Sequence, residues 1–452
     1  MTVRLQSAHG RGILLATVLG SGVAFLDTTV VNVALPTLGR ELHAGMAGLQ
    51  WTVDAYLLTL SALLLLGGSL GDVFGYRRMF VLGLGWFALA SAACGFAPSI
   101  GWLVAARAVQ GAGAALLVPG SLAVLRQSFD DDEQGQAIGA WAGLSGVTTA
   151  LGPLVGGWLI SAWTWRAVFF LNLPLAAAAI WTAVRCVPES RAARSTRIDV
   201  AGAGAATLGL AGVVYALIEA RGTGPGSSAA AAAGVVCLIG FIWIEARRHQ
   251  PMLPLGLFRS RQFSGANAVT LAVYFALGGS TFLLVLQLQQ VLEYSPLASG
   301  AALMPLTVLL LLLSPPAGKL ASRIGYRWPM TIGPITVGAG MALLSGVARA
   351  SGYAAAVLPG VVVLGIGLAA TVAPLTTAVL AGSGERHAGV AAAVNTAVAR
   401  IAGLLAVALL PLLAGVASPD PESLAAGFAR AMWICAGVSV AGGMIALATL
   451  RH

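Results

Sequence analysis

An aspartate deep inside the first apolar segment is the residue in this sequence best suited to proton chemistry. Asp27 lies about 14 residues into an apolar run near 13–35, roughly two-thirds of the way across a membrane if the run is helical. A carboxylate at that depth is unfavourable when it is charged, so we expect Asp27 to bind and release a proton near neutral pH. A structural aspartate, hydrogen-bonded to neighbouring helices, is the alternative.

An arginine is the second charged residue expected at membrane depth. Arg107 lies inside the apolar run near 101–124, where it costs several kcal/mol unless it is paired or hydrated. Residues three and four apart share one face of a helix, so Arg107, Gln110 and Gly111 form one polar, close-packing stripe. Snorkelling of the arginine to the outer interface is the alternative.

One further acid and one further arginine complete the charges within apolar runs. Asp54 lies only a few residues inside its run, where it either binds a cationic substrate or faces an outer vestibule. Arg400 is a second intramembrane cation, which can pair across a pocket with an acid. Because the apolar runs contain two acids and two arginines, we expect neutral or monovalent substrates rather than divalent cations.

Membrane helices are the elements that must position these residues. The chain has 452 residues, of which 58% are hydrophobic and 9% charged, whereas a soluble domain carries roughly 25% charged residues. Apolar runs of roughly 20 residues, the length of a membrane-spanning helix, recur along the whole sequence. The net charge of +9 comes from arginines in short loops, which indicates loop orientation rather than nucleic-acid binding.

Hydropathy and basic residues together predict a topology. Windows of roughly 19 residues predict fourteen spans, near 13–35, 50–71, 79–96, 101–124, 135–160, 166–187, 198–218, 228–245, 264–291, 297–320, 329–347, 353–374, 388–415 and 427–450. An even number leaves both termini on one side of the membrane. Of the 25 basic residues, 18 lie in loops and tails on that side and five on the other, which predicts cytoplasmic termini.

A repeat at an offset of 250 residues divides the chain into halves. Five residues after the second span recur after the tenth: Gly68, Leu70, Gly75, Tyr76 and Arg77 return as Gly318, Leu320, Gly325, Tyr326 and Arg327. We therefore expect a six-helix bundle at 1–190, two inserted helices with their linkers at 191–250, and a second six-helix bundle at 251–452. Parallel repeats of six helices are typical of transporters.

The loop after the second span combines glycines with charges. It reads Gly68-Ser69-Leu70-Gly71-Asp72-Val73-Phe74-Gly75-Tyr76-Arg77-Arg78. Glycines allow a tight turn at the membrane edge, and Asp72 can pair with an arginine or lie at a helix N-terminus. The pattern resembles motif A of the major facilitator superfamily, with Tyr76 in the usual basic position. The resemblance implies a gating role for Gly68, Asp72, Gly75, Arg77 and Arg78; a charged loop that only sets orientation is the alternative.

Two further motifs of that superfamily are present. Arg107-Ala108-Val109-Gln110-Gly111 is similar to motif B, in which the arginine is linked to proton coupling. Gly152-Pro153-Leu154-Val155-Gly156-Gly157 resembles motif C, which marks antiporters, usually exporters. Small residues at this spacing let helices approach closely, and the proline removes a backbone hydrogen bond. The resemblance thus implies conformational roles for Gly152, Pro153, Gly156 and Gly157.

Four other stretches resemble the fourteen-span drug/proton antiporter family of the QacA/EmrB type. They run from Leu26 to Pro36, from Gln50 to Tyr56, from Gln287 to Pro296 and from Asn395 to Gly403. In the third stretch, Glu293 stands where glycine is usual. The resemblance implies proton coupling at Asp27 and Arg107, and a substrate pocket that includes Asn32, Asp54, Gln110, Gln287, Asn395 and Arg400.

The implied protein is an all-α polytopic membrane protein with the major facilitator fold. It would export lipophilic drugs, dyes or a host-made antibiotic in exchange for protons by alternating access. A proton that neutralises Asp27 would displace substrate in the outward state, and substrate would favour proton loss in the inward state, with Arg107 tuning the acid. Its expected partners are a small-molecule substrate, protons and membrane lipids, without nucleic acid, and we expect a monomer in the bacterial cytoplasmic (inner) membrane.

Two other functions remain open at this point. The same scaffold serves a dedicated exporter of one metabolite or amino acid, and a transport-inactive sensor or scaffold protein is an alternative of another class. The sequence contains no Gly-x-x-x-x-Gly-Lys-Ser/Thr loop and no His-Glu-x-x-His pair, so ATP hydrolysis and zinc hydrolysis are not expected. We therefore expect no enzyme, no metal site and no cofactor other than the proton gradient.

Overall fold

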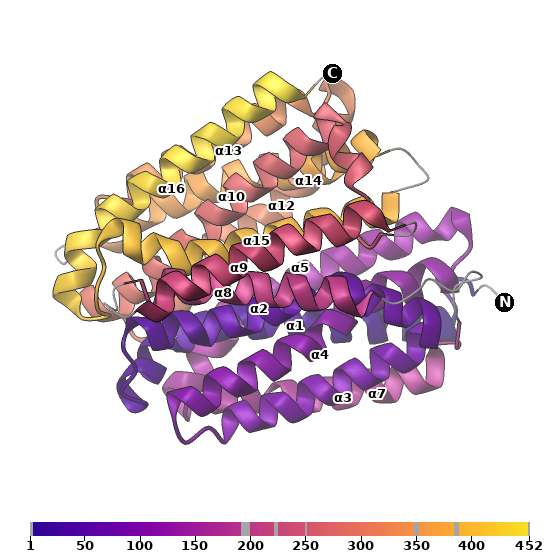
Figure 1. Ribbon diagram of the computed structural model, residues 1–452, viewed down its shortest axis with the longest axis horizontal. Helices are drawn as coiled ribbons and strands as arrows, with labels where there is room; N and C mark the ends of the chain where they lie inside the picture. Colours follow the sequence, from indigo (N-terminus) through magenta and orange to yellow (C-terminus); the bar gives the residue numbers. More distant parts are fainter. Residues whose placement is uncertain are drawn as a thin grey trace. The chain divides into compact units, whose positions relative to one another are not determined.

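The regular elements of the computed structural model are helices throughout residues 3–190, 199–220, 225–248, 251–347, 352–383 and 388–450, which the structure describes (Figure 1). They are α1 (Ala8–Glu41), α2 (Met46–Phe74), α3 (Tyr76–Gly95), α4 (Ile100–Ser128), α5 (Asp131–Ala162), α6 (Ala167–Phe170), α7 (Asn172–Cys186), α8 (Val200–Ile218), α9 (Pro225–Arg247), η1 (Leu255–Arg259), α10 (Arg261–Leu286), η2 (Gln287–Val291), α11 (Pro296–Ala302), α12 (Met304–Ile324), α13 (Arg327–Leu344), η3 (Tyr353–Val357), α14 (Leu358–Ser383), α15 (Ala388–Ala414) and α16 (Pro421–Thr449). Except in its first and last turns, a helix satisfies its backbone polar groups within the segment, as a lipid environment requires.

Thirteen helical segments in the described part of the chain are long and apolar enough to cross a membrane. These thirteen segments correspond to thirteen of the fourteen expected spans. The exception is the expected span near 329–347, where the 18-residue helix α13 is not among the thirteen segments. The expected span near 166–187 is divided into α6 and α7 at Leu171. The expected class, a polytopic helical membrane protein, is confirmed, and a total of fourteen spans stays a prediction.

Side-chain caps mark where several helices begin. The hydroxyls of Ser7, Ser99, Ser260 and Ser295 accept hydrogen bonds from first-turn backbone N–H groups of α1, α4, α10 and α11. Asp420 caps α16 in the same way. Each cap satisfies a backbone donor that the helix itself leaves unpaired, and this fixes the helix start locally.

The chain forms two compact units. Unit 1 comprises Met1–Ala44, Trp51–Ala211 and Ala233–Met252, and unit 2 comprises Gly45–Gln50, Gly212–Ala232 and Leu253–His452. The inserted helices α8 and α9 are each shared between the units. The expected boundaries near 190 and 250 stay a prediction, and residues 191–198 of the first linker lie outside the described residues.

Helix packing repeats from one unit to the other. In unit 1, α1 packs against α4, α5 and α7, and α3 packs against α4 and α7. In unit 2, α10 packs against α14, α15 and α16, and α13 packs against α14 and α16. Each pairing in the first set has its counterpart in the second, so the repeat read from the sequence is a repeat of tertiary structure.

The turns after the second helix of each half repeat as well. Gly75 and Gly325 have φ angles of 101° and 80°, in the region that only glycine adopts without strain. A side chain at position 75 would also overlap the carboxylate of Glu189. Because that carboxylate is the flexible end of a side chain and can move aside, the backbone conformation is the requirement that selects glycine at Gly75.

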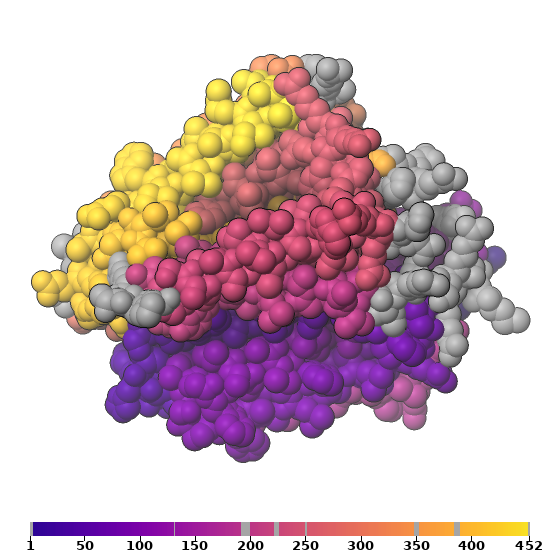
Figure 2. All heavy atoms as spheres, viewed as in Figure 1, coloured from indigo at the N-terminus to yellow at the C-terminus, as the bar shows by residue number. Residues whose placement is uncertain are grey.

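Large apolar side chains cover the outside of the helices. Trp86, Leu89, Phe96, Trp102 and Trp163 in unit 1 are each between 54% and 77% exposed. In water such a surface would aggregate, whereas a bilayer solvates it and accommodates tryptophan near the headgroups. Figure 2 draws the heavy atoms of one face of the molecule, coloured by position along the chain.

Candidate functional site

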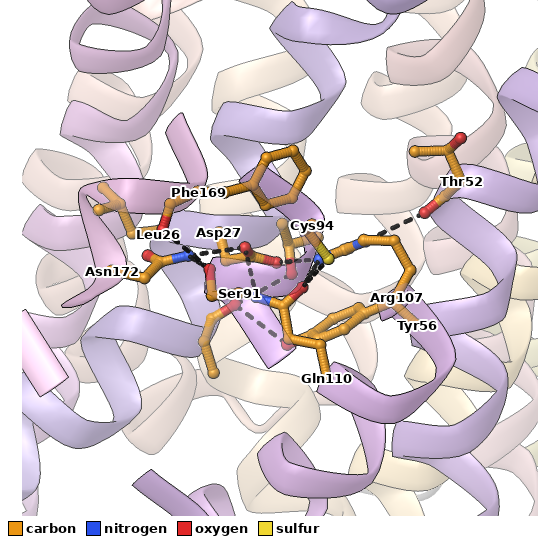
Figure 3. Close-up of polar contacts among 12 residues, drawn as sticks. Leu26, Asp27, Thr52, Tyr56, Ser91, Cys94, Arg107, Gln110, Phe169 and Asn172 are labelled. Atoms are coloured by element: carbon orange, nitrogen blue, oxygen red, sulfur yellow. Dashed lines mark hydrogen bonds and ion pairs between the residues drawn. The ribbon is translucent and has the colours of Figure 1, made fainter. Parts of the chain in front are cut away.

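Asp27 is buried in α1 and accepts hydrogen bonds from three side chains of unit 1 (Figure 3). Arg107 Nη1 lies 2.5 Å from its Oδ2, and Gln110 Nε2 and Asn172 Nδ2 each lie 2.9 Å from its Oδ1. Charge-assisted bonds of this kind are about twice as strong as neutral ones. These three donors therefore offset much of the cost of burying the carboxyl group.

Arg107 is equally buried, with 1% of its side chain exposed. Its Nε donates to the Thr52 carbonyl at 3.1 Å, and its Nη1 also donates to Gln110 Oε1 at 2.6 Å. The guanidinium lies 4.2 Å from the centre of the Tyr56 ring, a cation–π distance. Arg107 therefore does not snorkel to an interface, and its charge is neutralised by Asp27 inside the bundle.

Two residues that the sequence interpretation missed complete this site. Asn172, at the start of α7, donates from Nδ2 to Ser91 Oγ of α3 at 3.0 Å as well as to Asp27. Ser91 Oγ in turn donates to the Phe169 carbonyl at 2.9 Å. Asn172 could have been identified from the sequence because it is a lone amide inside an apolar run. Polar residues at membrane depth cost free energy and therefore mark functional positions.

Asp54, in α2, presents the opposite situation. It is fully buried, and neither of its carboxylate oxygens has a hydrogen-bond partner in the described part of the chain. Burying an ionised carboxylate without donors costs several kcal/mol. Asp54 is therefore expected to be neutral in this conformation. Its two interpretations, an acid that binds a cationic substrate and a residue of an outer vestibule, both stay predictions.

The remaining pocket candidates fall into two groups. Asn32 is half-buried, five residues after Asp27 on α1. In unit 2, Asn395 Nδ2 donates to Thr270 Oγ1 at 2.6 Å and to Asn267 Oδ1 at 3.2 Å, which joins α15 to α10. Gln287 Nε2 donates to the Val347 carbonyl at 3.1 Å at the start of the π-helix η2, and Arg400 is half-buried on α15. Substrate binding by Asn32, Asn395, Gln287 and Arg400 stays a prediction.

The motif A loop is bound to the chain that follows α7. Arg77 donates to the Val187 carbonyl at 3.2 Å, and Arg77 Nε and Arg78 Nε lie 3.5 and 3.7 Å from Glu189 Oε2. Tyr76 donates its backbone N–H to the Ser190 carbonyl at 3.0 Å. Glu189, which the motif reading did not single out, is thus the acid that both arginines share.

Within the same loop, Asp72 accepts a hydrogen bond from the hydroxyl of Tyr76. A tyrosine in the usual basic position therefore still supplies a donor to the motif A aspartate. At Gly68, a Cβ would meet nothing closer than Pro119 Cβ at 3.9 Å. Space alone therefore does not require glycine at position 68.

The glycines of the motif C stretch bring α5 against α1 beside Asp27. A Cβ on Gly152 would overlap Thr29 Oγ1, and a Cβ on Gly156 would lie 2.8 Å from Val30 Cγ1. Pro153 and Gly157 are buried in the same stretch of α5. A larger side chain at positions 152 or 156 must displace Thr29 or Val30 of α1, the helix that carries Asp27.

Comparison with known proteins gives the family. The Major Facilitator Superfamily profile matches residues 17–407. The chain belongs to the Major Facilitator Superfamily. Members of this superfamily are membrane transporters, so the protein is a transporter and not an enzyme.

Three curated relatives in the superfamily resemble most of this chain. The multidrug resistance protein Stp of Mycobacterium tuberculosis is 35% identical over 88% of this chain and 74% of its own length. The tetracenomycin C resistance and export protein of Streptomyces glaucescens is 34% identical over 88% and 75%. The puromycin resistance protein of Streptomyces alboniger is 36% identical over 85% and 78%.

Solved structures of the superfamily share the fold at low sequence identity. A peptide-transporter family protein in complex with 5-aminolevulinic acid has a TM-score of 0.74 at 12% identity, covering 97% of this chain and 95% of that one. A bacterial homologue of the lysosomal transporter Spinster, in an inward-facing conformation, has a TM-score of 0.70 at 16% identity, covering 98% and 97%. Likeness at this level of identity establishes the fold alone.

Proposed function

We propose that this protein exports lipophilic small molecules (drugs, dyes or a host-made antibiotic) in exchange for protons. Relatives at 34–36% identity are named for resistance to, or export of, antibiotics, which supports drug efflux. We further propose that the protein is a fourteen-span antiporter of the QacA/EmrB type that works by alternating access. It lies in a bacterial inner membrane as a monomer, with both termini in the cytoplasm.

The observation that carries proton coupling is the buried ion pair of Asp27 and Arg107. The pair is neutral as a unit while Asp27 is ionised, and it gains a net positive charge when Asp27 takes up a proton. In a buried site of low dielectric that unit charge changes the local potential strongly. Protonation thereby weakens the binding of a cationic or polarisable substrate nearby, and substrate binding favours loss of the proton by the same linkage.

Asp54 supplies a second carboxyl group to this scheme. As a neutral, buried acid it becomes charged only when a donor or a cation reaches it, which a change of conformation or a cationic substrate would provide. We propose that Asp27 is the main coupling acid and that Asp54 contacts substrate. Gln110, Asn32, Asn395, Arg400 and Gln287 are the other proposed pocket residues.

Motifs A and C have conformational roles in this proposal. The loop of Gly68, Asp72, Gly75, Arg77 and Arg78 gates the cytoplasmic side, and Gly152, Pro153, Gly156 and Gly157 let α5 and α1 pack closely. A rocking motion needs such bistable, closely packed contacts rather than a loose interface.

The test is transport by purified protein in proteoliposomes with an imposed pH gradient and a panel of dyes and antibiotics. Wild type should drive uptake or efflux according to the gradient's sign, and Asp27→Asn should abolish that response. Asp420→Asn is the matched control, because asparagine caps a helix as well as aspartate does and position 420 lies at the exposed start of α16.

Three outcomes separate the alternatives. Transport without response to the gradient in wild type rejects proton coupling. Transport of one metabolite or amino acid alone indicates the dedicated exporter. No transport of any compound by folded protein indicates a sensor or scaffold.

A further inference from the structure

Asn172 differs from the other two donors to Asp27 in one respect. Its Nδ2 has two acceptors, Asp27 Oδ1 and Ser91 Oγ. Its Oδ1 is buried and has no hydrogen-bond partner in the described part of the chain. The side chain as a whole is fully buried. A buried amide oxygen without a donor is uncommon and calls for an explanation.

Arg107 and Gln110 can only donate to Asp27 and cannot accept a hydrogen bond from its protonated form. Arginine has no acceptor atom. Gln110 Oε1 already accepts from Arg107 Nη1 at 2.6 Å and from Cys94 Sγ at 3.5 Å, so its amide is fixed with Nε2 toward the carboxylate. Turning that amide over would place its NH₂ against the guanidinium, which also only donates.

In the described part of the chain, no hydrogen bond to Oδ1 opposes a turn of the Asn172 amide. The torsion that rotates a terminal amide is broad and roughly two-fold, so the exchange of Nδ2 and Oδ1 keeps the shape of the side chain. No acceptor role of Oδ1 would be lost. Ser91 Oγ, which now donates to the Phe169 carbonyl, could donate to the turned Oδ1 instead.

A protonated Asp27 needs such a change. The neutral acid carries an O–H donor, and a site with donors only would leave it facing two N–H groups at Oδ1. We propose that Asn172 is the positioning residue that adapts the site to both protonation states of Asp27, with its amide donating to the carboxylate and, turned over, accepting from the acid. This rests on the proposed role of Asp27 in proton coupling.

The other ionisable groups at this site do not offer the same adaptation. Arg107 comes from α4, Cys94 from α3 and Tyr56 from α2, and each is already engaged. The Tyr56 hydroxyl donates to the Ala24 carbonyl at 3.3 Å, away from the carboxylate. Of the groups that contact Asp27, Asn172 alone combines a donor in use with an acceptor not in use.

Infrared spectroscopy can test this without measuring transport. The carbonyl band of a protonated carboxylic acid, present in wild type and absent in Asp27→Asn, reports Asp27 directly in purified protein moved from alkaline to acidic buffer. In Asn172→Leu the acid loses its acceptor, and its carbonyl band should shift to higher frequency. Asn267→Leu, which removes a buried asparagine of unit 2 that is 4% exposed, should leave the band unshifted.

A second measurement needs no substitution at Asn172. The chain contains four asparagines (Asn32, Asn172, Asn267 and Asn395), so asparagine labelled with ¹³C at the side-chain carbonyl gives few bands. One labelled amide band should shift on acidification in wild type and stay fixed in Asp27→Asn.

The outcomes separate this inference from the proposed function. An Asp27 acid band at the same frequency in wild type and Asn172→Leu, or labelled amide bands that do not respond to pH, would overturn the role of Asn172 and leave proton coupling intact. Absence of any Asp27 acid band in wild type would reject both.

Discussion

His43 and Glu293 are related by the 250-residue repeat and share a left-handed backbone conformation, with φ angles of 49° and 59°. They are the only non-glycine residues with positive φ in the described part of the chain. His43 follows α1, and Glu293 follows η2 at the end of α10, the helix that corresponds to α1. Because this conformation is costly for residues with a Cβ, its recurrence indicates that both halves require it where their first helix ends.

Glu293→Gly should therefore stabilise the protein by about 1 kcal/mol, because the strain at a left-handed residue is removed. The gain is reduced by the greater freedom of glycine in the unfolded chain. Thermal unfolding in detergent measures the change. Glu293→Ala, which keeps a Cβ, is the control and should bring no gain; an equal gain in both variants would show that loss of the carboxylate, not backbone strain, is responsible.

Removal of one member of the Asp27–Arg107 pair should destabilise the fold by about 3–5 kcal/mol, because the other charge is left buried and unpaired. Asp27→Asn combined with Arg107→Gln should recover most of that loss, since neither variant residue is charged. Denaturation of the two single variants and the double variant checks this cycle. Additive losses would mean that the two side chains do not interact. Gradient-driven transport should stay absent in all three.

Gly156→Ala should lower transport at least tenfold, because its Cβ would press on Val30 Cγ1 and displace α1 beside Asp27. Gly146→Ala in the same helix is the matched control, since nothing lies within 4 Å of a Cβ there. That control should be slightly stabilised, by about 0.5–1 kcal/mol, through its better helix propensity. The measurement is the initial rate of dye transport by each variant, normalised to the amount of folded protein. Equal rates in Gly156→Ala and Gly146→Ala would contradict the proposal that close packing of α5 against α1 is needed for transport.

Glu189→Gln should reduce the transport rate several-fold with little change in unfolding temperature. The pairs with Arg77 and Arg78 are partly exposed, and such pairs contribute only about 0–1 kcal/mol to stability. Their proposed role is to hold the motif A loop. Glu41→Gln, which breaks the 3.5 Å pair with Arg166 elsewhere in unit 1, is the comparison variant. A rate unchanged in Glu189→Gln contradicts that role.

The proposed orientation can be checked with single cysteines in a cysteine-free background. Pro98→Cys, in the loop between α3 and α4, should react with an impermeant reagent added to intact cells. Arg126→Cys, near the end of α4, should react only after lysis. Both positions are exposed. The reverse pattern would place the termini outside and contradict the positive-inside count.

Much of the architecture could be predicted from the sequence, because its causes are local. Span length and hydropathy depend on composition within about 20 residues. Charges at Asp27 and Arg107 stood out because lipid penalises any charge at that depth. The 250-residue repeat could be recognised at Gly75 and Gly325, because a turn that needs a positive φ angle favours glycine at that position of the sequence.

The partners of Asp27 were decided by tertiary structure. Arg107 and Asn172 lie 80 and 145 residues from Asp27 along the chain, and only the packing of α1 with α4 and α7 brings the three together. Packing also separates two acids that look alike in sequence, because, among the residues that the structure describes, Asp27 receives three donors and Asp54 receives none. A carboxyl group's charge state depends on which groups face it, and distance along the chain does not carry that information.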